Sequence, residues 1–127
     1  MLKLNKKILS TYIILYSVFG NQEFNLGEAL RVLSLFESKK SAISDIKHLH
    51  KMGFLKKTNS FTYSVKEPYT ALKEYLKEYI ASRIRRRLKS LSLKAEVKVN
   101  SKITVKVKNE TLFIKIPQNP LITFQEP

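Results

Sequence analysis

The segment from Ser38 to Leu55, SKKSAISDIKHLHKMGFL, constrains the fold more than any other part of the chain. On a helix, Ala42, Ile46 and Leu49 recur at i, i+4 and i+7 and form one apolar stripe. Gly53 then lets the helix end in a left-handed turn. The segment therefore predicts a short helix with one buried face. Its outer face carries polar residues, namely Lys40, Ser44, Lys47, His48 and Lys51.

Two more helices are predicted before this segment. The apolar spacing favours a first helix over Lys6–Phe19. A second helix begins after Asn25, which is a good N-cap and has Glu28 three residues later, as in a capping box. Residues 34–37 then turn the chain, and Ser38 caps the third helix. Two short helices joined by a few residues are typical of helix-turn-helix geometry.

A hairpin is predicted after the third helix, because residues 54–57 and 61–65 favour strands and residues 58–60 supply turn chemistry. Three helices, the pattern A-x-x-x-I-x-x-L-x-x-x-G-F-L over Ala42–Leu55 and a hairpin resemble winged helix-turn-helix regulators of the MarR, ArsR and PadR type. The resemblance covers about residues 5 to 66. It implies a DNA-binding domain with its third helix in the major groove, and a dimer formed by the helix after the hairpin.

The C-terminal half begins with a long helix, predicted over Tyr69–Leu91. Its first and second halves carry apolar faces about 100° apart, so it should contact two different surfaces. From Lys94 to Pro117 apolar residues alternate with polar ones, which predicts three antiparallel strands. The expected fold class is α+β: a winged helix-turn-helix domain over 1–67, a long helix and candidate dimerisation element over 68–93, a three-stranded antiparallel β-meander over 94–117, and an extended tail over 118–127.

Composition favours a partner that is a polyanion. The chain has 127 residues, with 24 Lys and Arg against 10 Asp and Glu, and its formal net charge is +14. Such a charge attracts nucleic acid or an anionic membrane surface. No cysteine is present, which favours an intracellular protein. With a DNA partner, the expected location is cytoplasmic and nucleoid-associated. The apolar run 8–19 is too short to span a bilayer and contains several polar residues, so no membrane partner is expected.

The candidate DNA contacts lie on the third helix and in the hairpin. Lysine, serine and histidine side chains donate hydrogen bonds to phosphates or to base edges in a major groove. The contacts predicted on this basis are Lys39, Lys40, Ser41, Ser44, Lys47, His48 and Lys51 on the helix, with Lys56, Lys57 and Asn59 in the hairpin. Asp45 lies to one side and is expected to pair with a lysine.

A second basic patch is predicted near the end of the long helix, where Arg83, Arg85, Arg86, Arg87 and Lys89 are concentrated. These residues either bind phosphates when a dimer lies along a duplex, or serve solubility and offset the helix dipole. Both alternatives are kept.

The sequence does not favour an enzyme, a metal site or a cofactor. His48 and His50 are two positions apart on a helix and point in different directions, and no cysteine stands near them. Ser44 and His48 could touch, but the sequence supplies no orienting acid, and three glycines form no phosphate-binding loop.

The leading hypothesis is a homodimeric, sequence-specific transcriptional regulator that binds double-stranded DNA through residues 38–52, with no small-molecule effector assigned. One alternative is a non-specific architectural DNA-binding protein, which the charge alone supports. The other is a protein-interaction winged helix whose C-terminal helix and sheet dock in a larger assembly. RNA binding by the meander is a minor variant of the last.

Overall fold

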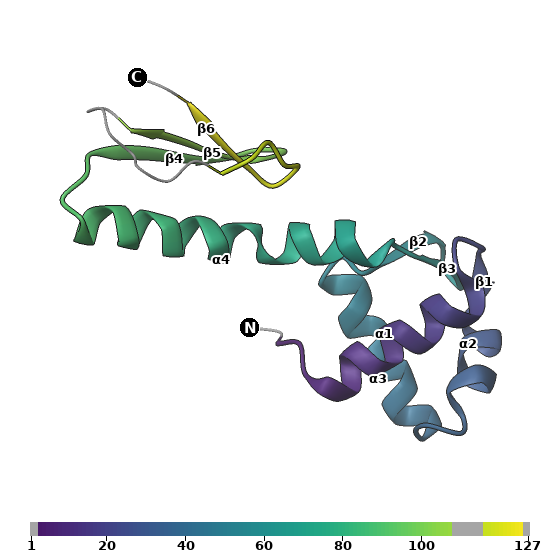
Figure 1. The fold of residues 1–127 in the computed structure, drawn as a ribbon. Helices are drawn as coiled ribbons and strands as arrows, with labels where there is room; N and C mark the ends of the chain where they lie inside the picture. The colour runs from purple at the N-terminus through teal and green to yellow at the C-terminus, as the bar shows by residue number, and fades with distance from the viewer. Residues whose placement is uncertain (1–2, 108–115, 126–127) are drawn as a thin grey trace. The chain divides into compact units, whose positions relative to one another are not determined.

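The computed structural model describes residues 3–107 and 116–125. Within these residues the chain is α+β, with four helices and two three-stranded sheets (Figure 1). It divides into two compact units, Met1–Leu72 and Lys73–Pro127, which we call unit 1 and unit 2. The helix α4 (Pro68–Ser90) begins in unit 1 and continues in unit 2.

Unit 1 contains the helices α1 (Lys6–Phe19), α2 (Leu26–Leu33) and α3 (Lys39–Lys51), all where the sequence predicts them. The predicted capping box at the start of α2 is confirmed, because Asn25 and Glu28 each accept the other's backbone N–H. The side chain of Ser38 caps α3 by accepting the backbone N–H of Ser41 at 3.2 Å. Local hydrogen bonds therefore set where both helices begin.

The end of α3 forms a Schellman motif, in which two backbone N–H groups bond back to the last turn. The Gly53 N–H donates to the His50 carbonyl at 3.1 Å, and the Phe54 N–H donates to the Leu49 carbonyl at 2.9 Å. Gly53 has a φ of 88°, which a residue with a Cβ adopts only at a cost. This motif turns the chain from α3 directly into the hairpin.

The first sheet contains β1 (Phe24–Asn25), β2 (Leu55–Asn59) and β3 (Thr62–Val65) in the antiparallel order β1-β3-β2. Two details differ from the sequence prediction. The turn between β2 and β3 falls at residues 60–61, because Thr58 and Asn59 lie within β2. The strand β1 was not predicted, since two residues carry no alternation, and it pairs with β3 between Phe24 and Tyr63.

The core of unit 1 is formed by residues from all three helices and from the hairpin. Tyr12 and Leu15 of α1 are buried with Ile46 and Leu49 of α3. The ring of Tyr12 meets the ring of Phe54 edge-on, with 5.0 Å between centroids. α3 therefore rests with its apolar stripe on α1, which leaves its opposite side to solvent.

Unit 2 consists of α4 and a sheet of β4 (Ala95–Val99), β5 (Ile103–Val107) and β6 (Ile122–Gln125) in the order β4-β5-β6. β4 and β5 are antiparallel, as predicted. The predicted antiparallel meander is wrong in its third strand, because β6 lies in the segment expected to be an extended tail and runs parallel to β5. The strand predicted at Leu112–Ile116 falls almost wholly outside the described residues.

The sheet of unit 2 covers one side of α4. Ala81 and Leu88 of the helix form a buried cluster with Val97, Ile103 and other apolar residues of the strands. The helix ends in a second Schellman motif, with Ser92 at a φ of 57° and the Leu93 N–H bonded to the Leu88 carbonyl at 3.0 Å. Among residues 3–107 and 116–125, no helix has an apolar stretch long enough to cross a lipid bilayer.

Candidate nucleic-acid interface

The outer side of α3 carries most of the residues that the sequence singles out. Because Ala42, Ile46 and Leu49 face the core, helical periodicity turns the intervening residues outward. His48 is half-buried. The exposed members are Lys39, Lys40, Ser44, Lys47 and Lys51.

Asp45, the acidic residue of α3, points into unit 1 and is only 2% exposed. Its Oδ1 lies 3.0 Å from the ammonium nitrogen of Lys7, and its Oδ2 accepts a 3.0 Å hydrogen bond from the Thr11 hydroxyl. The expected pairing with a lysine is therefore present, but the lysine comes from α1. No residue of α3 therefore places a carboxylate on the outer side of the helix.

The ion pair shifts the pKa values of both its members. Burial would raise the pKa of the Asp45 carboxyl, but hydrogen bonds with Glu37, Lys7 and Thr11 outweigh it and hold that pKa below its usual range. The hydrogen bond to Asp45 is also the main reason why the pKa of Lys7 is raised. Both groups are therefore charged near neutral pH.

Ser41 belongs to this interior network and not to the outer side. Its hydroxyl donates a 2.9 Å hydrogen bond to Glu37 Oε1, and its backbone N–H is held by Ser38. Glu37 also accepts the Thr11 hydroxyl at 2.7 Å. Ser41 thus connects the start of α3 to the turn before it.

The hairpin and α3 together form one concave surface, which encloses a hollow of about 270 Å³. We call it the α3–hairpin surface. It is lined by Ser44, Lys47, His48, His50, Lys51, Lys57 and Tyr63. Lys57 lies on β2 with its ammonium nitrogen 5.7 Å from the centre of the Tyr63 ring on β3. The surface combines cations, hydroxyl and imidazole groups and an aromatic ring.

Two members of this surface, His50 and Tyr63, were not predicted as contacts. The spacing of His48 and His50 indicates different directions, but the hairpin closes around the end of α3, so both line the same hollow. The Tyr63 ring meets His50 edge-on at 6.3 Å and stacks on Phe24 at 6.1 Å. The sequence offered one usable signal, since Tyr63 alternates with polar neighbours on a predicted strand.

Other predicted hairpin contacts lie outside the hollow. Lys56 and Asn59 are exposed but do not line it. The Asn59 side chain accepts the backbone N–H of Phe61 at 3.1 Å, so it shapes the turn between β2 and β3.

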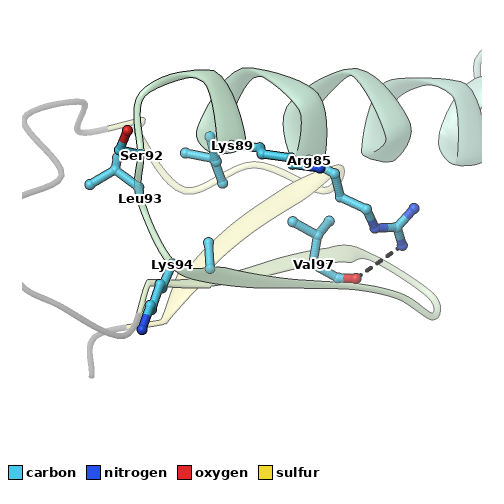
Figure 2. Close-up of a pocket in the computed structure, with 8 residues that line it drawn as sticks. Arg85, Lys89, Ser92, Leu93, Lys94 and Val97 are labelled. Carbon is cyan, nitrogen blue, oxygen red and sulfur yellow. Dashed lines mark hydrogen bonds between the residues drawn. The ribbon is translucent and has the colours of Figure 1, made fainter.

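In unit 2 the predicted basic patch divides into two parts. Arg83, Arg86 and Arg87 together line one open hollow of about 230 Å³ on α4. Arg85 instead donates a 3.0 Å hydrogen bond to the Val97 carbonyl, and its side chain crosses from α4 to β4 (Figure 2). Lys89 lies with Arg85 beside a groove of about 560 Å³, between the end of α4 and β4, whose apolar lining is Leu88, Leu93, Ala95 and Val97.

Within the described part of the chain, no three His, Asp or Glu side chains gather in a way that could hold a metal ion. Comparisons with models of protein families, with curated proteins and with solved structures give no match for this chain.

Proposed function

We propose that the protein binds double-stranded DNA through the α3–hairpin surface, as a winged helix-turn-helix regulator with α3 in the major groove. One observation carries this proposal: the exposed side of α3 and the hairpin form a single hollow lined by three lysines and two histidines. Lysine and histidine donors of this kind suit phosphate oxygens and base edges.

The direction of Asp45 supports the same proposal. A carboxylate on the outer side of α3 would repel phosphates, and a repulsive charge at the groove would reduce affinity for any sequence. Here Lys7 and Thr11 hold the carboxylate inside unit 1. The side of α3 that faces solvent therefore carries positive and neutral side chains and no carboxylate of α3.

The arrangement also separates residues by expected role. Lys40, Lys47 and Lys51 are exposed lysines along α3 and are suited to phosphates. Ser44 and His48 lie between them at i and i+4, where a helix in a major groove places side chains against base edges. A homodimer would read two half-sites about one helical turn apart.

The test is a selection of bound fragments from random double-stranded DNA, followed by affinity measurements on the enriched sequence at several salt concentrations. We expect one enriched motif. If six to eight cations contact phosphates, log K falls with log salt at a slope of about −5 to −7. Lys51→Ala should weaken all sequences alike, whereas Ser44→Ala or His48→Ala should change the preferred sequence.

The control is Lys106→Ala, which removes the same charge from an exposed position of unit 2. It should leave the enriched motif unchanged. Tight binding with no enriched motif, and no effect of Ser44→Ala, would instead indicate the non-specific architectural protein. Failure to bind DNA at low salt would rule out both and leave the protein-interaction module.

A further inference from the structure

We propose that β4 is the interface between two copies of this chain, paired antiparallel through its open edge with the two Val97 residues opposite each other. β4 is the end strand in the order β4-β5-β6, and among the described residues no strand pairs with its other side. An open edge presents unpaired N–H and C=O groups that another strand can use.

The hydrogen-bond pattern shows which residues of β4 face the open edge. The Asn100 N–H donates to the Lys102 carbonyl at 3.0 Å, so Asn100 and Lys102 form a hydrogen-bonded pair of the β4–β5 ladder. Such pairs alternate along an antiparallel ladder. Ala95, Val97 and Val99 therefore direct their backbone groups away from β5, toward the open edge.

The contact of Arg85 supports this assignment independently. Its guanidinium donates a 3.0 Å hydrogen bond to the Val97 carbonyl (Figure 2), as expected if that carbonyl is not used in the β4–β5 ladder. In a single copy, Arg85 thus occupies the Val97 carbonyl, one of the hydrogen-bond acceptors on the open edge of β4. When β4 of a second copy pairs with this edge, a backbone N–H of that strand replaces the Arg85 guanidinium as the donor to the Val97 carbonyl.

The charges of β4 identify a second copy as the occupant. With Val97 opposite Val97, Glu96 of each copy lies opposite Lys98 of the other, so two ion pairs form on the outer face. Cross-strand pairs of opposite charge stabilise a sheet, and like charges in these positions destabilise it. Lysine on an edge strand usually discourages pairing. In β4, however, Lys98 lies 3.4 Å from Glu96 of its own strand, so its charge is already offset.

The inner face is also self-complementary. Ala95 and Val99 pack against the apolar cluster of unit 2 together with Val97. In the proposed register each Ala95 lies opposite Val99 of the second copy, beside the apolar groove that Leu88 and Leu93 help to line. The two sheets then form one six-stranded sheet with a continuous apolar inner face. The same patch serves both copies, as two-fold symmetry requires.

Light scattering on the full chain without DNA tests this inference, so the outcome does not depend on the proposed function. We expect a mass twice the 14.8 kDa of one chain. Lys98→Glu places two glutamates opposite each other at both ends of the interface and should weaken the dimer about tenfold or more. The exchange Glu96→Lys with Lys98→Glu restores both ion pairs and should restore the dimer.

Two further variants test whether the open edge of β4 makes the dimer. Ala95→Pro removes an N–H that faces away from β5, so the fold should persist while the dimer is lost. Lys6→Glu makes the same charge change as Lys98→Glu at an exposed position of α1, in unit 1, and should leave the dimer intact. Circular dichroism confirms that each variant is folded.

A folded wild-type chain that stays monomeric at hundreds of micromolar would overturn the inference. A dimer that folded Lys98→Glu and Ala95→Pro leave as tight as in wild type would also overturn it, because the copies would then meet through another surface.

Discussion

The ammonium nitrogen of Lys7 lies 3.0 Å from Asp45 Oδ1, and this ion pair joins α1 to α3 across 38 positions of the sequence. The two partners differ in burial, since the side chain of Asp45 is 4% exposed and that of Lys7 is 49% exposed. Together with the buried stripe of Ala42, Ile46 and Leu49, the pair therefore holds the rotation of α3 about its axis. That rotation decides which residues of α3 reach the α3–hairpin surface.

Loss of either partner of this ion pair should destabilise the fold. Asp45→Ala removes one carboxylate that bonds both Thr11 and Lys7, while Glu37 stays within reach of both, and we expect the free energy of unfolding to fall by about 2 kcal/mol. Lys7→Ala leaves the buried carboxylates of Asp45 and Glu37 without their cation and should also cost about 2 kcal/mol or more. Urea denaturation measures both changes, and Lys6→Ala, an exposed neighbour on α1, is the matched control. Equal losses for Asp45→Ala and Lys6→Ala would contradict the prediction.

The same pair predicts how stability depends on acid. The pKa of Asp45 in the folded chain lies below its ordinary value of 3.8, so the unfolded chain takes up the proton first as the pH falls. The contribution of Asp45 is complete above the unfolded pKa and is lost as the pH falls through the folded pKa. The difference in stability between wild type and Asp45→Ala should therefore shrink below about pH 4. A difference that stays constant down to pH 2 would show that the carboxylate charge is not involved.

Tyr12 gives a corresponding prediction in alkali. Its hydroxyl donates a 2.7 Å hydrogen bond to the Lys66 carbonyl, and burial, followed by the charge of Glu67, raises the pKa of Tyr12 to about 12. The unfolded chain loses this proton near pH 10, so stability should fall by about 2 kcal/mol as the pH rises from 10 to 12. Tyr12→Phe should cost about 1 kcal/mol at neutral pH and should lack that part of the alkaline loss. Denaturation at several pH values checks this against Tyr79→Phe, an exposed residue that should change neither quantity.

The elements that the sequence predicts well are those whose causes are local. The bounds of α1 follow from apolar periodicity, and the starts of α2 and α3 follow from the side chains of Asn25 and Ser38. Each of these signals acts within four residues of the backbone group that it satisfies. The winged-helix resemblance and the DNA-binding residues rest on such local patterns and stay predictions.

The pairings that the sequence did not predict depend on distant partners. β6 covers Ile122–Gln125, where apolar and polar residues alternate over four positions, a signal that the expectation of an extended tail missed; its parallel pairing with β5 has no counterpart in the sequence pattern. Likewise, Asp45 could be expected to pair, but only the packing of α1 on α3 shows that its partner is Lys7.

The end of α4 should be improved by a single substitution. Ser92 holds a left-handed φ of 57°, which costs a residue with a Cβ about 1 kcal/mol. Ser92→Gly removes that cost, and we expect the free energy of unfolding to rise by about 0.5 kcal/mol after the extra freedom of glycine in the unfolded chain is counted. Ser90→Gly is the matched control, because Ser90 is in the last turn of α4 and glycine there should destabilise by about 0.5 kcal/mol. Thermal unfolding separates the two, and a loss of stability in Ser92→Gly would contradict the prediction.

The three arginines that share one hollow on α4 should contribute to DNA binding through charge alone. Arg83, Arg86 and Arg87 are exposed, and no ion pair joins them to a carboxylate among the described residues. Replacing all three with alanine should weaken binding to every DNA sequence alike. It should also make the slope of log K against log salt shallower by up to about 3, since each phosphate contact contributes about 0.9. Replacing all three with lysine keeps the charge and should retain most of the slope. Fluorescence anisotropy at four salt concentrations, on the enriched motif and on a scrambled duplex, gives both slopes. An unchanged slope in the alanine variant would limit the role of these arginines to solubility and the helix dipole.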